Sequence, residues 1–110
     1  MDLVVTEMKR SHLVHIAGRV DSSNAPQLQE KLAALVKGGA RNLVINMKDV
    51  SFLSSAGLRT LLSTLQAAKK QGGDVRLSEV SEPVARVLEL TSFDMHFKCF
   101  GTDTEAIGSF

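Results

Sequence analysis

Apolar and β-branched residues gather in short segments at the start of the chain, separated by polar residues. Leu3 to Met8 is one such segment, and Ser11 to Gly18 is the next. This pattern predicts two adjacent strands joined near Lys9 and Arg10. A polar stretch from Gly18 to Asn24 then predicts a loop.

The spacing of apolar residues changes to that of a helix after this loop. The residues at helical spacing are Ala25, Leu28, Leu32, Leu35 and Val36. Pro26 lies near the predicted first turn, where a missing backbone N–H costs little. Gly38 and Gly39 predict the end of the helix.

The middle of the chain repeats the strand-then-helix order. Leu43 to Met47 is a nearly continuous apolar run, which predicts a central strand buried on both faces. The following helix is predicted to end near Gln71 to Gly73, and its apolar face comprises Leu58, Leu61, Leu62 and Leu65. We expect these leucines to belong to the core.

Three further elements and a closing helix are predicted in the last third. Val75 to Leu77 predicts a strand, and Ser81 to Pro83 is a helix-start signal followed by Val84, Val87 and Leu88. Phe97 to Phe100 predicts an edge strand, and Asp103 to Phe110 a short final helix. Strands that alternate with helices imply an α/β fold with a mixed sheet, parallel crossovers and an antiparallel first pair. A length of 110 residues predicts one domain, residues 1–110, with one core.

Composition excludes several classes of protein. The net charge is +1, basic residues are scattered and the only aromatics are five phenylalanines, so we expect no nucleic-acid partner. No apolar run approaches the roughly 20 residues that span a bilayer, and the start of the chain lacks the features of a signal peptide. We therefore expect a cytoplasmic protein without membrane insertion. The single cysteine, Cys99, is expected to be a small buried hydrophobe in a reducing compartment.

No constellation of catalytic or metal-binding residues is evident. Ser54 and Ser55 have a strand-to-helix context like a nucleophile elbow, but Leu53 replaces the first glycine and His96 is the only downstream histidine. His12 and His15 face opposite sides of a strand. No phosphate-cradling glycine pattern is present. We therefore expect no enzyme activity, no catalytic residue, no metal and no cofactor.

Two adjacent serines at a helix start are the feature richest in functional meaning. One interpretation is that they cap the helix, which is worth about 0.5–2 kcal/mol relative to alanine. The other is that one of them accepts a phosphate, since a dianion at a helix N-terminus finds backbone donors and a favourable dipole. Arg59, one turn on, is either a solvated charge or a contact for a partner beside the serines.

Two motifs resemble the STAS domain of bacterial anti-sigma factor antagonists. The segment from Asp49 to Leu58, within Leu43 to Leu62, is similar to the family signature, and Gly18 to Ala25 is similar to its glycine–x–aliphatic–aspartate loop. The resemblance covers essentially the whole chain. It implies a mixed four- to five-stranded sheet with about four helices packed against it.

The resemblance also implies a partner-switching role. In this family the unphosphorylated protein binds an anti-sigma factor that is itself a serine kinase, and binding frees the sigma factor. The kinase uses ATP to phosphorylate the antagonist, which then dissociates, and a metal-dependent serine phosphatase restores it. The chain is then a substrate and a switch.

Carried onto this sequence, the family motif assigns the phosphoacceptor to Ser55, two positions before Gly57, with Ser54 as the alternative. The commonest family pattern has aspartate at position 54 and a hydroxyl at position 56, where this chain has Ser54 and Ala56. Asp21 and Asp49 match acidic family positions that order the loop and contact the kinase; a plain turn-forming role is the alternative. The residues predicted to bind the partner are Asp21, Ser22, Asn24, Asp49, Ser54, Ser55, Ala56, Gly57 and Arg59.

A second function is compatible with the same resemblance. Some STAS domains are non-switching adaptor subunits of membrane-associated complexes, such as those of lipid transport, and need no phosphorylation. The retained serines favour the switch. We expect a monomer, because the predicted helices leave no spare apolar stripe once they cover the sheet.

Overall fold

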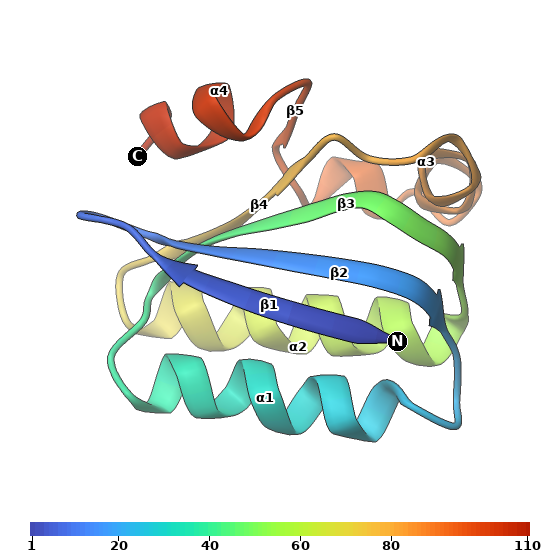
Figure 1. Cartoon of the computed structure of the whole chain (residues 1–110), viewed down its shortest axis with the longest axis horizontal. Helices are drawn as coiled ribbons and strands as arrows, with labels where there is room; N and C mark the ends of the chain where they lie inside the picture. Colours follow the sequence, from blue (N-terminus) through green and yellow to red (C-terminus); the bar gives the residue numbers. More distant parts are fainter.

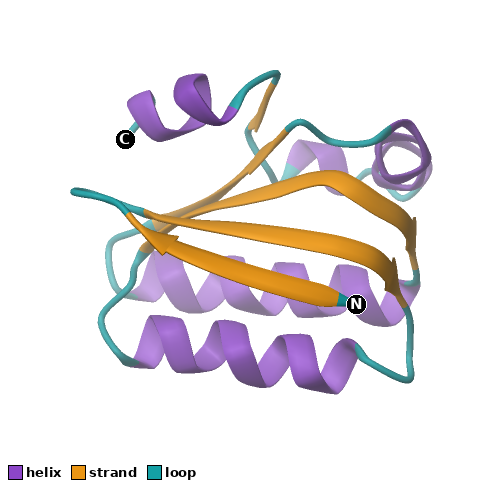
Figure 2. Ribbon diagram, in the orientation of Figure 1, coloured by secondary structure: helices purple, strands orange, loops and turns teal.

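A five-stranded mixed sheet forms the middle layer of the molecule (Figures 1 and 2). The computed structural model describes all of residues 1–110. The strands lie side by side in chain order: β1 (Asp2–Glu7), β2 (His12–Val20), β3 (Asn42–Leu53), β4 (Asp74–Ser78) and β5 (Cys99–Phe100). β1 pairs antiparallel with β2, and every other neighbouring pair is parallel. The predicted mixed sheet with an antiparallel first pair is confirmed.

Helices lie on both sides of this sheet (Figure 1). The two long helices, α1 (Ala25–Lys37) and α2 (Ser55–Lys70), run side by side below it as drawn, and α3 (Glu82–Leu90) and α4 (Asp103–Gly108) lie above. A 3₁₀ turn, η1 (Phe93–Met95), connects α3 to β5. None of these helices has the length and apolar character that crossing a bilayer requires.

The core lies mainly between the sheet and the two long helices. All five residues from Leu43 to Met47 are buried, as predicted for a central strand with both faces covered. The core-facing positions of α1 and α2 are Leu28, Leu32, Val36, Leu58, Leu61 and Leu65. Each fully buried leucine contributes about 1.5–3 kcal/mol to stability, so this layer holds the strand ends in fixed positions.

Two strands are longer than the apolar runs that predicted them. β3 continues past Met47 to Leu53, and β2 reaches Val20 within the predicted loop. Register shifts interrupt the β2–β3 pairing between His15 and Ala17 and again at Gly18, which has φ +96°. These irregularities break the period-2 pattern on which the predicted bounds depend. β5 is shorter than predicted, since only Cys99 and Phe100 pair.

Two expectations about burial are wrong. Cys99 lies on the short edge strand and is exposed, not buried. Partial desolvation of its thiol group, followed by the negative charge of Asp94, raises the pKa of the thiol. The helices also leave part of the sheet uncovered at β1, where Val4 is 59% exposed. The reason is that α3 packs on β3, and α4 on β3, β4 and β5. The monomeric state stays a prediction.

Candidate functional site

The serine site comprises Ser54, Ser55 and the neighbouring loop Asp21–Asn24. It lies where β3 ends and α2 begins. The Ser54 N–H donates to the Val20 carbonyl at 2.9 Å, which ties this junction to the end of β2. The Ser54 hydroxyl oxygen accepts a hydrogen bond from the Gly57 N–H at 3.3 Å. Ser54 is therefore the N-cap of α2, so the capping interpretation of the pair is correct for one serine.

Ser55 is the first residue of α2 and is exposed. Its hydroxyl is free, because the capping role belongs to Ser54. The side chain lies at the positive end of the helix dipole, and no acidic residue occupies the first turn. The geometry thus separates the two serines: one hydroxyl stabilises the helix and the other is available to an incoming enzyme.

Gly57 brings the start of α2 close to the strand ends. A Cβ atom at this position would lie 2.6 Å from Leu53 Cδ1 and 2.8 Å from Val20 Cγ1. Only glycine lets the helix start approach these buried side chains without displacing them. The predicted site residue Gly57 is therefore a packing residue, and it is buried.

The loop beside the serines is ordered by its own side chains. Asp21 Oδ1 accepts from the Ser23 N–H at 3.0 Å and from the Ser23 hydroxyl at 2.5 Å. Asn24 Oδ1 accepts from the Asp21 N–H, and Asn24 Nδ2 donates to the Arg19 carbonyl at 2.8 Å. The hydrogen bond from the Ser23 hydroxyl is the main cause of the lowered pKa of Asp21. Asp21 thus orders the loop and presents a carboxylate ionised at neutral pH.

A shallow groove runs between the starts of α1 and α2. Three predicted partner-binding residues line it: Ser22 on one side, with Ala56 and Arg59 on the other. Ser22 and Arg59 are exposed. Across the groove the Gln29 amide donates to the Ser63 hydroxyl at 3.4 Å. Ser55, the neighbour of Ala56 in the chain, therefore lies close to a groove whose surface is mainly apolar and which also offers hydrogen-bonding groups and one cation.

Asp49 occupies a different environment from Asp21. It lies within β3 opposite Ala17, and its carboxylate contacts His15 Nε2 at 2.9 Å. The turn-forming interpretation of Asp49 is therefore wrong, since the strand extends through it. His12 and His15 lie on opposite sides of β2, as predicted. His12 lines a hollow beside the end of α1, whereas His15 contacts Asp49. No group of metal-ligating side chains occurs in the structure.

Sequence reasoning missed Arg19 and Phe52. The two residues are paired in the β2–β3 register, and the Arg19 guanidinium carbon lies 4.3 Å from the centre of the Phe52 ring. The same guanidinium lies 3.9 Å from the Asp21 carboxylate. The contact depends on the register shift after Gly18; a glycine within a strand is a local signal for a bulge, but it does not specify which residues pair beyond it. These residues give the serine site an aromatic and cationic border.

Replacing the cap is expected to cost stability. Ser54→Ala removes the acceptor of the Gly57 N–H and should lower the free energy of unfolding by about 1 kcal/mol. The matched control is Ser55→Ala, which removes a free hydroxyl and should change it by less than about 0.5 kcal/mol. Urea denaturation of both variants measures the difference. Equal losses in the two variants would contradict the division of roles between the serines.

Comparison with known proteins places the chain in a family. The family model for the STAS domain matches residues 3–106, and the chain belongs to this family. Among curated proteins it is 44% identical over 78 residues to an anti-sigma-B factor antagonist of Bacillus subtilis (strain 168), a match covering 71% of each chain. The predicted family is therefore confirmed.

Solved structures agree with this assignment. An anti-sigma factor antagonist from Mycobacterium paratuberculosis superposes with a TM-score of 0.87 at 28% identity, covering 98% of this chain and 92% of that one. An anti-sigma-factor antagonist (STAS) domain protein from Planctomyces limnophilus gives a TM-score of 0.86 at 22% identity, covering 99% and 97%. At the lower identity the likeness shows the fold alone.

Proposed function

We propose that this chain is an anti-sigma factor antagonist, which frees a sigma factor by binding its inhibitor. Membership of the STAS family supports the proposal, as does the 44% identity to an anti-sigma-B factor antagonist over most of both chains. The chain acts by docking and carries out no catalysis of its own. It works in the cytoplasm, where sigma factors and their inhibitors meet.

The regulated group in this proposal is the hydroxyl of Ser55. The observation that carries it is the contrast between the neighbours: Ser55 is exposed and free, whereas the Ser54 oxygen holds the Gly57 N–H. A phosphate on Ser54 would have to displace that hydrogen bond. A phosphate on Ser55 leaves the cap intact and meets the positive end of α2. The alternative acceptor, Ser54, is therefore the less suitable of the two.

The chemistry belongs to the partners. An anti-sigma factor with serine-kinase activity binds ATP and transfers its γ-phosphoryl group to the Ser55 hydroxyl oxygen, releasing ADP. A metal-dependent serine phosphatase later hydrolyses the phosphoester. This chain contributes the acceptor and the surface that positions it, and it needs no cofactor.

The docking surface of the proposal surrounds the acceptor. The loop residues Asp21, Ser22 and Asn24 border one side, and Arg59 in the groove borders the other. Ala56 has only a methyl group and Gly57 has no side chain, so the first turn of α2 projects little beyond the backbone beside Ser55. Asp49 lies within β3, where His15 contacts its carboxylate, and in this proposal it contacts the partner at the periphery of the surface. A dianion added in the centre of this surface places charge where partner groups are desolvated.

Phosphate mapping tests the acceptor. The chain is incubated with Mg-ATP and the anti-sigma kinase that co-purifies with Ser55→Ala, and the modified residue is identified by mass spectrometry. We expect a phosphate on Ser55 in the wild type. We also expect it in the control variant Ser51→Ala, which removes a different exposed serine near the site. We expect none in Ser55→Ala. A phosphate on another residue, or none at all, contradicts the proposed switch.

The same co-purification separates the switch from the adaptor. Recovery of an anti-sigma kinase supports the antagonist. Recovery of transporter ATPase subunits, with binding unaffected by Ser55→Glu, would instead favour a non-switching subunit of a membrane-associated complex.

A further inference from the structure

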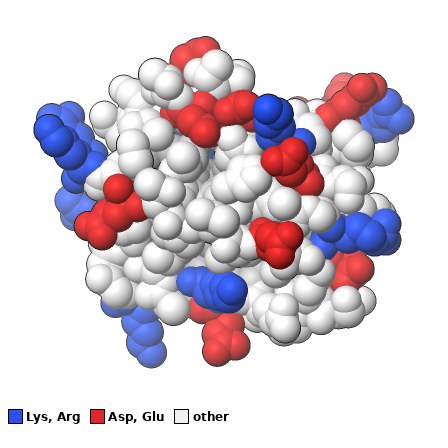
Figure 3. All heavy atoms as spheres, viewed as in Figure 1, with Lys and Arg blue, Asp and Glu red and all other residues white.

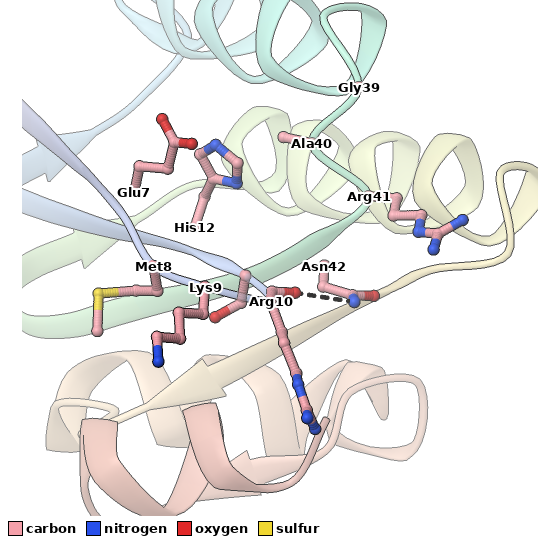
Figure 4. Close-up of a pocket in the computed structure, with 10 residues that line it drawn as sticks. Glu7, Met8, Lys9, Arg10, His12, Gly39, Ala40, Arg41 and Asn42 are labelled. Atoms are coloured by element: carbon pink, nitrogen blue, oxygen red, sulfur yellow. Dashed lines mark hydrogen bonds between the residues drawn. The ribbon is translucent and has the colours of Figure 1, made fainter.

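A second polar pocket lies at the far end of the sheet from Ser55. It is formed by the turn between β1 and β2, residues 7–12, and by the connection from α1 to β3, residues 39–42 (Figure 4). This hairpin-end pocket has a volume of about 430 Å³. The Asn42 amide donates to the Arg10 carbonyl at 3.1 Å and ties the two segments together. This hydrogen bond holds the two segments together at one point of the rim, and the proposed switch does not use the pocket.

The rim of the pocket is cationic. Lys9, Arg10 and Arg41 line it, and none of the three forms an ion pair within the chain, whose four ion pairs all lie elsewhere. Basic side chains gather at this end of the molecule beside the β1–β2 turn, on the left in Figure 3. In Figure 4 the Lys9 and Arg10 side chains extend to the side opposite Glu7 and His12, and the Arg41 side chain extends away from both of them, so the three would have to turn inward to meet one anion. Long flexible side chains with unpaired charge are able to fold over an anion.

The inner wall contains a buried hydroxyl without a partner. Ser11 lines the pocket and is 3% exposed. Its Oγ is the only buried side-chain polar atom of the chain with no hydrogen-bond partner. A buried hydroxyl left unpaired costs free energy that an apolar side chain would not. A serine here is explained if its hydroxyl donates to a ligand.

Two features of the pocket oppose an anion. Glu7 carries a negative charge on the side of the pocket shared with His12 (Figure 4). The C-terminus of α1 is also near, but the N–H groups of Gly38, Gly39 and Ala40 already bond its last carbonyls. Three unpaired cations against one carboxylate leave the pocket positive.

We propose that the hairpin-end pocket binds the phosphate group of a small phosphorylated metabolite. Arg41 and Arg10 approach the phosphate oxygens with paired N–H donors, and Lys9 adds a point charge. The rim opens enough for the Ser11 hydroxyl to donate to one oxygen. The volume is within the range of small-ligand sites, so the phosphate carries an organic group of modest size.

Nuclear magnetic resonance tests the site with inorganic phosphate and pyrophosphate as probes. Each is titrated into the ¹⁵N-labelled full chain at constant ionic strength, with chloride as the reference salt. We expect saturable shifts confined to the amides of residues 7–12 and 39–42, with pyrophosphate binding more tightly. Arg41→Gln and Ser11→Ala should each raise the pyrophosphate Kd at least fivefold. Lys69→Gln, an exposed cation on α2, should leave it unchanged.

The variants distinguish this site from general attraction to charge. Ser11→Ala removes an unpaired buried hydroxyl, so the variant should fold and melt at the wild-type temperature or above it. An unchanged Kd in Ser11→Ala would show a hydroxyl without a ligand role and would overturn the proposal. Equal effects of Arg41→Gln and Lys69→Gln would also overturn it, as would binding of a single-stranded oligonucleotide without binding of pyrophosphate.

Discussion

Ser55→Glu is expected to weaken binding to the anti-sigma factor by more than tenfold. The reason is that residue 55 lies at the centre of the proposed docking surface, where a carboxylate is desolvated against a partner surface that accommodates a neutral hydroxyl. Leaving a charge unpaired in an interface costs about 2–5 kcal/mol, and each 1.4 kcal/mol is a tenfold change in Kd. Calorimetric titration with the co-purified partner measures the loss.

The fold should tolerate this substitution. The first turn of α2 has no acidic residue, and a carboxylate near a helix N-terminus adds about 0.3–1 kcal/mol of stability. Ser55→Glu should therefore melt at or above the wild-type temperature. The matched control is Thr104→Glu, which adds the same charge at an exposed position of α4. Equal binding losses in both variants would indicate a general charge effect and would sink the proposed surface.

Gly73→Ala is expected to destabilise the fold by about 2–4 kcal/mol. A Cβ atom at this position would lie 1.9 Å from the Arg41 carbonyl oxygen and 2.5 Å from its carbon. Both are backbone atoms, so the clash is relieved only if the start of β4 moves away from the start of β3. That movement strains the packing and breaks the hydrogen bond from the Asp74 N–H to the Arg41 carbonyl.

Gly101→Ala is the matched control for this prediction. Nothing lies within 4 Å of a Cβ at position 101, so the change should stay within about 0.5 kcal/mol. Urea denaturation followed by circular dichroism measures both variants. Similar midpoints for Gly73→Ala and Gly101→Ala would show that the two strands separate at little cost, contrary to the buried packing described above.

The order of helices and strands was predictable because each is encoded by a local period. The core positions of α1 and α2 repeat every three or four residues, and the run from Leu43 to Met47 is apolar throughout. The extension of β3 to Leu53 was not predictable in this way. Lys48 and Asp49 are exposed and polar within the strand, and the accompanying bulge shifts the pattern of faces.

The serine site was likewise predictable only in part. Its position at a helix start follows from the sequence, since serine before an amphipathic run indicates an N-cap. Which of the two serines caps α2 depends on one side-chain rotamer and on the Val20 contact that fixes Ser54. The neighbourhood of Arg19, Phe52 and Asp21 depends on strand register, which is a property of the folded chain.

The strands lie in the sheet in the order in which they occur along the chain. Each strand after β1 thus pairs with the strand that precedes it along the chain. We expect the growing chain to assemble from its N-terminus, with little time spent exposing unpaired apolar edges.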